Sequence, residues 1–443
     1  MPKTASKSWP FVRLNSAVFD QLEVVSASGA YLHTADGKKI LDASAGAVVG
    51  NIGWGRQEVA DAAAESLARL AYALPPIATP ERLELAERLS EQWLPGNMPG
   101  ISFFGSGSEA NEAAMRLARQ YQLAIGRDSR WKIIGRDVSY NGTTLATLAV
   151  GGHDARRNDF KPMMQDMPHA PACYCLRCPL GKTYPSCKVA CATELEAIIE
   201  REGADTIAAF HVEAITGTSG GGLVPPDEYL PTIAKICKRH DILLIIDEVL
   251  TGFGRTGERM AVDHWQVEPD IIVLGKGMSG GYAAMSAVAT KPHIPKAMEA
   301  AGITPMFHTY AGHPSQCAAA NKTLEILDRE QLVPRVQELG PVLEGKLKTL
   351  LDNPYVVDVR GRGFLYGIEV ARNKETLEMF PADAAVTFKI MEATVARGVF
   401  TYFGGTGTVR DVIIVAPPFI INEEEMDTIV GALDEAITEV CSS

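Results

Sequence analysis

The chain has 443 residues, 46% of them hydrophobic, and its 42 basic against 54 acidic residues give a formal net charge of −12 at pH 7. This length is enough for a large and a small domain with a substantial buried core. Because there is no basic block and no apolar stretch of about 20 residues, the sequence argues against nucleic-acid binding and against a membrane span. The N-terminal residues also lack the apolar core of a signal peptide, so we expect a cytoplasmic protein.

The first elements in chain order predict a β-hairpin followed by a long α/β region. Residues 29–33 and 39–42 are the two strands of the hairpin, joined by a turn that contains Ala, Asp and Gly. From about residue 60 to about 330, helix patterns such as 81–92 alternate with apolar strands such as 207–210. This alternation is typical of a mostly parallel sheet covered by helices.

A second unit begins near residue 332. Its expected strands cover 355–360, 363–370 and 412–415, with two or three helices packed against them. We therefore expect an α/β fold in which both chain ends form one small α/β domain. The expected boundaries are 1–59 and 332–443 for the small domain and 60–331 for the large domain.

An anion site is expected where a glycine-rich loop enters a helix. Ser106 and Glu109 fit a capping box at the start of a helix pattern with an alanine-rich face. The amides of Gly107 and Ser108 would then point out of the helix N-terminus, where free N–H groups and the helix dipole favour a phosphate. An ordinary capped helix is the alternative interpretation.

Two apolar runs in the middle of the chain end in opposite charges. Residues 243–246 lead into Asp247, and residues 271–274 lead into Lys276, which lies between two glycines. Burial would lower the pKa of the lysine and leave a neutral, nucleophilic amine. A buried carboxylate needs a partner, and the protonated pyridine nitrogen of pyridoxal phosphate is one. The pair predicts this cofactor, whereas a single strand-end lysine more often points into solvent.

Two glycine-rich segments carry no chemistry in our interpretation. Residues 217–222 lack the lysine and the spacing of a nucleotide-binding loop, so we expect a turn. Residues 404–407 are expected to form a mobile loop that borders the pocket.

Cysteines crowd one segment that is also rich in proline and glycine; they are Cys173, Cys175, Cys178, Cys187 and Cys191. The Cys-x-x-Cys pair within this set makes a zinc site one interpretation. We favour free thiols or a structural staple without metal, because the pairs are not symmetrically spaced. The remaining cysteines are scattered, as in reduced cytosolic enzymes.

The motifs together resemble those of the class III aminotransferases in order and spacing. The matching segments are residues 106–110, 140–142, 247–257, 269–277 and 309–314. The resemblance extends over nearly the whole chain, down to residues 416–419. It implies a fold type I pyridoxal phosphate enzyme that works as a homodimer or larger homo-oligomer with shared active sites.

The resemblance also implies a role for each matching residue. Lys276 would bind the cofactor covalently and later act as the base, and Asp247 would keep the pyridine nitrogen protonated. Tyr140 would stack on one face of the cofactor ring, and Val249 would contact the other face. Glu213 would be the strand-end carboxylate beside the ring. Gly107 and Ser108 would bind the phosphate, together with Thr309 of the neighbouring subunit.

Departures from the family pattern bear on the substrate. Asn141 and Ala214 stand where relatives usually have histidine and proline, and we expect neither to touch the chemistry directly. Val48 stands where amine-type relatives often carry a tryptophan, which predicts an open pocket for long or bulky amines. Arg410 is the nearest candidate for binding a substrate carboxylate.

The resulting expectation is transamination from an amine or ω-amino compound to a keto acid such as pyruvate. An aminomutase or racemase is the alternative, because those relatives share the same cofactor residues. A cofactor-binding regulator is disfavoured, since the chain has no appended DNA-binding motif or basic face.

Overall fold

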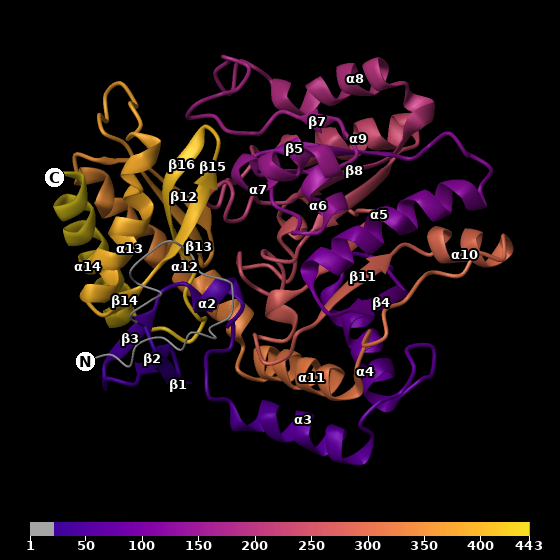
Figure 1. Ribbon diagram of the computed structural model, residues 1–443, viewed down its shortest axis with the longest axis horizontal. Helices are drawn as coiled ribbons and strands as arrows, with labels where there is room; N and C mark the ends of the chain where they lie inside the picture. The colour runs from indigo at the N-terminus through magenta and orange to yellow at the C-terminus, as the bar shows by residue number, and fades with distance from the viewer. Residues whose placement is uncertain (1–21, 443) are drawn as a thin grey trace.

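The computed structural model describes residues 22–442 and has an eight-stranded sheet at its centre (Figure 1). The strand order is β4-β11-β10-β9-β8-β5-β6, and β7 also pairs with β5. Neighbouring strands from β10 to β5 run parallel, whereas β11 is antiparallel to both of its neighbours. The bounds are β4 (Gly100–Phe104), β5 (Lys132–Asp137), β6 (Gly151–Gly152), β7 (His169–Ala170), β8 (Ile207–Glu213), β9 (Leu243–Asp247), β10 (Ile271–Leu274) and β11 (Ser286–Thr290). The expected mostly parallel sheet is confirmed.

Both faces of this sheet are packed, because successive side chains of its strands point to opposite sides. Ile245 and Val273 belong to a buried cluster with the alanine-rich face of α5 (Gly107–Ala124). Ile246 and Ile272 belong to the cluster on the other side, which includes residues of α8 (Ala190–Glu202) and α9 (Tyr229–His240). The apolar runs read from the sequence are thus buried central strands.

The register of the sheet brings the ends of β8, β9 and β10 to one edge. Asp247 lies opposite Glu213 on one side and opposite Val273 on the other. Since these strands are parallel, the segments that follow them meet at the same edge of the sheet. Such an edge is the usual place of a ligand site in α/β proteins.

Both chain ends contribute to a small sheet of order β1-β2-β3-β14. The bounds are β1 (Val24–Ser28), β2 (Tyr31–Thr34), β3 (Lys39–Asp42) and β14 (Val399–Phe400). The expected hairpin is confirmed as β2 and β3, which pair antiparallel, while β14 adds in parallel beside β3. The sequence did not predict β1 or β14.

The C-terminal part forms an antiparallel sheet of order β12-β13-β16-β15. The bounds are β12 (Val356–Arg362), β13 (Leu365–Val370), β15 (Tyr402–Thr406) and β16 (Val409–Val415). Residues 404–407, expected as a mobile loop, instead belong to strand β15 and its turn into β16. Helices α12 (Leu332–Lys348), α13 (Val386–Ala396) and α14 (Glu423–Cys441) accompany this sheet on the left of Figure 1.

The remaining helices surround the central sheet. The long helix α11 packs against α3 and α4 at the bottom of Figure 1. The bounds are α2 (Ala45–Val48), α3 (Gln57–Arg69), α4 (Pro80–Arg88), α6 (Leu145–Val150), α7 (Asp154–Arg157), α10 (His293–Ala300) and α11 (Pro314–Arg329). Among the helices between residues 22 and 442, none has the length and apolarity to cross a membrane. The domain boundaries at 59/60 and 331/332 stay a prediction.

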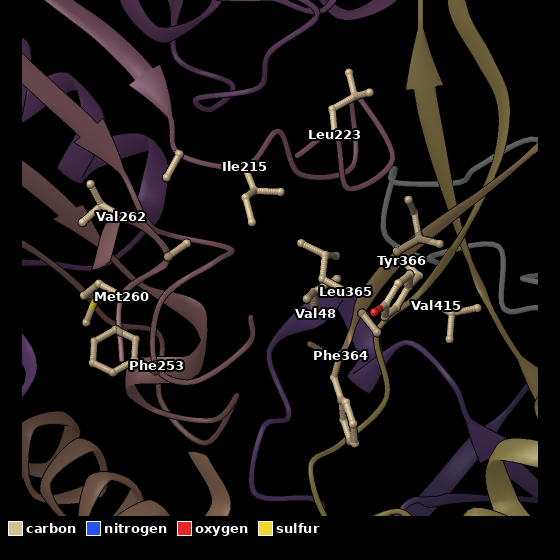
Figure 2. Close-up of a cluster of buried hydrophobic side chains, with 14 of the residues drawn as sticks. Val48, Ile215, Leu223, Phe253, Met260, Val262, Phe364, Leu365, Tyr366 and Val415 are labelled. Carbon is tan, nitrogen blue, oxygen red and sulfur yellow. The ribbon is translucent and has the colours of Figure 1, made fainter. Parts of the chain in front are cut away.

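A hydrophobic cluster joins the loop after β9 to the C-terminal sheet (Figure 2). Phe253 and Met260 follow β9 in sequence, and Phe364 and Val415 come from the C-terminal segment. The buried guanidinium of Arg255 crosses the same region and donates to the backbone oxygen of Phe364 at 3.1 Å. This packing fixes the C-terminal segment next to the edge of the central sheet that carries the site.

Candidate active site

A cavity of about 160 Å³ lies at the edge of the central sheet where β8, β9 and β10 end. It is lined by the ends of these strands, the N-terminus of α5 and the loop after β5. The lining residues are Gly107, Ser108, Asn111, Tyr140, Asn141, Gly142, Glu213, Thr218, Asp247, Val249, Leu250, Thr251 and Lys276. The structure thus brings together seven residues singled out from the sequence: Gly107, Ser108, Tyr140, Glu213, Asp247, Val249 and Lys276.

Lys276 lies two residues after the end of β10 and holds a left-handed backbone conformation with φ of 41°. Burial lowers the pKa of its amine from 10.5 to about 8, against the opposing effect of the Asp247 and Glu213 carboxylates. The neighbouring Gly277 is required by packing, because a Cβ there would lie 2.4 Å from Asn51 Nδ2. The lysine therefore combines strained backbone, restricted surroundings and a partly neutral amine, which suits a nucleophile.

The carboxylate of Asp247 is buried and held by three donors. Asn111 and Asn141 donate from Nδ2 to Oδ2 at 2.8 and 2.9 Å, and the amide of Val249 donates to Oδ1 at 2.9 Å. His211 lies 2.9 Å from Asn111 Oδ1, and because that oxygen only accepts, the imidazole donates from Nε2. Asn141 thus supports the Asp247 carboxylate, and the expectation that it does not touch the chemistry directly stays a prediction.

Glu213 shares the cavity with Asp247 and is oriented by two backbone amides. It accepts from the amide of Tyr140 at 3.0 Å and from the amide of Gly217 at 2.7 Å. Burial raises the pKa of this carboxyl to about 7, while the charge of buried Arg136 opposes the rise and Asp247 adds to it. Glu213 can therefore carry a proton near neutral pH.

The N-terminus of α5 opens into the cavity. Ser106 Oγ accepts from the amide of Glu109 at 3.3 Å, and the Glu109 carboxylate accepts from the amide of Gly105 at 2.7 Å, one residue before the amide expected for a capping box. A Cβ on Gly107 would lie 2.9 Å from Val249 Cγ1, so only glycine fits there. Ser108 Oγ accepts from the amide of Thr143 at 3.0 Å. The helix end offers the free amides that bind an anion.

Tyr140 and Val249 are the ring and the aliphatic side chain of the cavity wall. The guanidinium carbon of Arg156 lies 4.7 Å from the centre of the Tyr140 ring, and the His153 ring meets it edge-on at 6.4 Å. Both come from the segment that starts α7. A flat ring of a ligand would find an aromatic and an aliphatic surface here.

Three residues singled out from the sequence do not line this cavity. Thr309 is exposed, and its carbonyl accepts from Tyr72 Oη at 3.0 Å; its assignment to the neighbouring subunit's site stays a prediction. Val48 is 1% exposed and packs into the hydrophobic cluster of Figure 2, and its effect on the size of the substrate pocket stays a prediction. Arg410 donates to the carbonyl of Phe380 at 2.5 Å, and its assignment to the substrate carboxylate stays a prediction.

Sequence reasoning missed Asn111 and Arg136 as supports of the site. Asn111 lies on the alanine-rich face of α5 between buried Ala110 and Ala114, and a polar residue on an apolar helix face is the signal that pointed to it. Arg136 is fully buried and donates to Thr216 Oγ1 at 2.5 Å. Nothing in the sequence pattern of β5 distinguishes it from a strand-end arginine in solvent.

The cysteine segment surrounds a separate cavity of about 20 Å³. Its lining includes Cys173, Cys175, Cys178, Cys187 and Cys191. All eight cysteines of the chain are free thiols. Within residues 22–442, His, Cys, Asp and Glu side chains form no group of three or more that could hold a metal ion.

The donor set of the main cavity fits a phosphorylated pyridine aldehyde. The helix N-terminus suits the phosphate, and the amine of Lys276 suits the aldehyde. The Asp247 carboxylate, already held by three donors, can accept one more hydrogen bond from a protonated ring nitrogen. Pyridoxal phosphate has these three groups on one ring.

Comparisons with known proteins agree with this fit. A family model described as aminotransferase class-III matches residues 15–437. An uncharacterized aminotransferase of Bacillus subtilis, YhxA, is 40% identical over 427 residues, covering 95% of this chain and 93% of that protein. The putrescine–pyruvate aminotransferase of Pseudomonas aeruginosa is 33% identical over 428 residues, covering 95% of this chain and 91% of that protein. The solved (S)-enantioselective ω-transaminase of Thermomicrobium roseum superposes with a TM-score of 0.92 at 36% identity, covering 98% of this chain and 97% of that chain.

Proposed function

The chain belongs to the class III aminotransferases and has their fold type I architecture, and from this premise we propose that it uses pyridoxal phosphate to move an amino group from an amine or ω-amino compound to a keto acid such as pyruvate. The proposal rests on one observation: Lys276, Asp247 and the N-terminus of α5 line the same cavity. The name of the Pseudomonas aeruginosa relative, which pairs putrescine with pyruvate, supports this pair of substrate classes.

When bound, the cofactor supplies an aldehyde that receives the amino group and a pyridine ring that withdraws electrons. Lys276 would attach it covalently and, once released, carry the proton between the reacting carbons. Its pKa of about 8 suits this work, since an efficient general base titrates near the operating pH. Asp247 would hold the proton on the ring nitrogen. Tyr140 and Val249 would orient the ring between them.

Subunit contacts are part of the proposal. Apolar side chains that monomeric proteins normally bury are exposed in two neighbouring segments, residues 74–77 and residues 304–310. These side chains include Leu74, Ile77, Met306, Phe307 and Tyr310. Pro75, Pro76 and residues 304–307 line one groove between these segments. Thr309 lies in the second segment, which supports a homodimer or larger homo-oligomer in which Thr309 completes the neighbouring site. A cytoplasmic location stays our prediction from the sequence.

The cofactor link is tested on purified holoenzyme by borohydride reduction and peptide mapping. We expect the reduced cofactor on Lys276, and we expect Lys276→Ala to lose both the adduct and turnover by orders of magnitude. Lys291→Ala is the matched control, because Lys291 also follows a strand of the central sheet but at the opposite edge. An unmodified Lys276 in active enzyme would disprove the assignment.

The reaction class is tested by incubating stoichiometric enzyme with a panel of amines and amino acids. Transamination predicts conversion of the cofactor to its amine form and release of an aldehyde or ketone, and added pyruvate should reverse the spectrum and yield alanine. A product that keeps the amino group on a rearranged or inverted carbon would favour the aminomutase or racemase alternative. Asp247→Ala should retain some cofactor but little turnover.

A further inference from the structure

One cation near the site has no assigned partner. Arg156 lies on α7 with its guanidinium carbon 4.7 Å from the centre of the Tyr140 ring, and Tyr140 lines the cavity. The side chain is half-buried. Within residues 22–442 it makes no ion pair and no side-chain hydrogen bond. A half-buried guanidinium that contacts only an aromatic face still has its N–H groups available to donate to another group.

The other arginines around the site are already committed. Arg255 donates to Asn51, Phe364 and Pro417, and Arg136 donates to Thr216. The neighbour of Arg156 in α7, Arg157, contacts His169 at 3.1 Å. Arg410 donates to a backbone carbonyl of the C-terminal segment. Among the arginines around the site in residues 22–442, Arg156 is therefore one whose guanidinium is free to bind a ligand.

A cation beside the cavity would offset the carboxylates that an acidic substrate meets there. Asp247 and Glu213 both line the cavity and repel an incoming carboxylate. The positive charge of Arg156 is close enough to Lys276 to contribute to the lowering of that amine's pKa, after burial as the main cause. A carboxylate paired with Arg156 would thus lie within electrostatic range of the reacting amine.

The backbone around Arg156 is held from two sides. Figure 1 shows α7 between α6 and the C-terminal sheet. The turn between β15 and β16 touches it, since a Cβ on Gly407 would lie 3.0 Å from Asp154 Oδ2. The same hairpin is bonded to the loop after β8, because the amide of Gly405 donates to the carbonyl of Thr218 at 2.7 Å. Arg156 is therefore positioned by structured elements on the side of the cavity next to this hairpin.

We propose that Arg156 is the carboxylate-binding residue of the keto acid site, held ready by the face of Tyr140 and pairing through its guanidinium fork with the substrate carboxylate. This inference rests on the proposed transamination. It replaces Arg410, which the sequence alone suggested, in that role. A simple amine has no carboxylate and would not pair with Arg156. Arg156 would therefore contribute to binding of the keto acid but not to binding of the amine.

The two half-reactions test this separately in single-turnover spectra of holoenzyme. The probes are pyruvate with the amine form of the cofactor, and an uncharged monoamine such as benzylamine with the aldehyde form. For Arg156→Gln we expect kcat/KM of the pyruvate half-reaction to fall about 10- to 100-fold, the range for loss of one charged hydrogen-bonding partner. The benzylamine half-reaction should change much less. Arg156→Lys should recover part of the loss, because it keeps the charge without the fork.

Binding of propionate, which has the carboxylate but no reacting carbonyl, gives a readout independent of turnover. Its Kd for the aldehyde form, measured from the cofactor absorbance, should rise with the same ranking of variants. Arg157→Gln controls for disturbance of α7, and Arg410→Gln tests the rival residue. Equal slowing of both half-reactions in Arg156→Gln, an unchanged propionate Kd, or a selective loss in Arg410→Gln would overturn the proposal. Failure of wild-type enzyme to react with any amine would instead refute the proposed function.

Discussion

The lowered pKa of Lys276 makes a quantitative prediction about how the enzyme captures its cofactor. With a pKa of about 8 instead of 10.5, about one amine in ten is neutral at pH 7, against about one in three thousand for an ordinary lysine. Only the neutral amine attacks an aldehyde. Cofactor-free enzyme should therefore form its covalent link roughly 300-fold faster at pH 7 than an unperturbed lysine would allow.

The rate is measured by stopped-flow absorbance after mixing cofactor-free enzyme with pyridoxal phosphate between pH 6 and 10. The same series with N-acetyl-lysine corrects for titration of the cofactor itself. The rate should rise about tenfold per pH unit and level off near pH 8. Borohydride trapping and peptide mapping would verify that Lys276 is the residue that reacts.

Substitutions test the direction in which each neighbouring charge shifts the pKa of Lys276. The carboxylate of Asp247 stabilises the ammonium form, so Asp247→Asn should move the midpoint below 8, and Glu213→Gln should move it in the same direction by less. Arg156 acts with the opposite sign, so Arg156→Gln should move the midpoint upward. A wild-type midpoint near 10.5, or an upward movement in Asp247→Asn, would refute the reasoning that burial and these charges set the reactivity of Lys276.

Three further outcomes are expected. Asn111→Leu removes one donor from the Asp247 carboxylate and should weaken cofactor retention by about 1.5–3 kcal/mol, measured as the Kd for pyridoxal phosphate; an unchanged Kd would show that the remaining donors suffice. Mixing Lys276→Ala with Thr309→Ala should restore activity through hybrid dimers that contain one intact site, and no recovery after verified subunit exchange would count against shared sites. Thiol titration after denaturation should find all cysteines reduced, and elemental analysis should find no metal; one zinc per chain would make the segment around residues 173–191 a metal site.

The central sheet and the core of the site could be predicted from the sequence because they obey local rules. Buried parallel strands are short apolar runs, and the side chains at their carboxyl ends must meet at one edge. Asp247 and Lys276 stand at such ends and line one cavity. Gly107 and Ser108 were predicted from the helix start for a similar reason.

A glycine in the sequence can indicate either a flexible loop or a position where packing leaves no room for a side chain. The sequence predicts a mobile loop at residues 404–407, yet Gly404 belongs to β15, and a Cβ there would lie 2.7 Å from the carbonyl oxygen of Thr218. At Gly277, beside Lys276, the space of the missing side chain is filled by the side chain of Asn51. The sequence shows that a side chain is missing but not which neighbour fills the space.

The contact of Arg410 with Phe380 has a geometric basis in the same hairpin. The pairing of β15 with β16 shifts register between Gly404 and Thr406, and Asp411 has a left-handed φ of 60°. A shift of one residue turns every following side chain to the other face of a strand. The position of Arg410 in the sequence does not predict this change of direction. The folded hairpin determines that the Arg410 side chain contacts Phe380.

Substrate specificity is harder to predict than cofactor chemistry for a related reason. Most of the proposed cofactor residues lie near the ends of strands or at a helix start, where the sheet fixes both position and direction. The candidate substrate residue Arg156 lies instead on a four-residue helix, and its role depends on the contact of that helix with the turn at Gly407. On the proposed role of Arg156, binding of an acid would depend on a contact between segments about 250 residues apart, which a local sequence pattern does not predict.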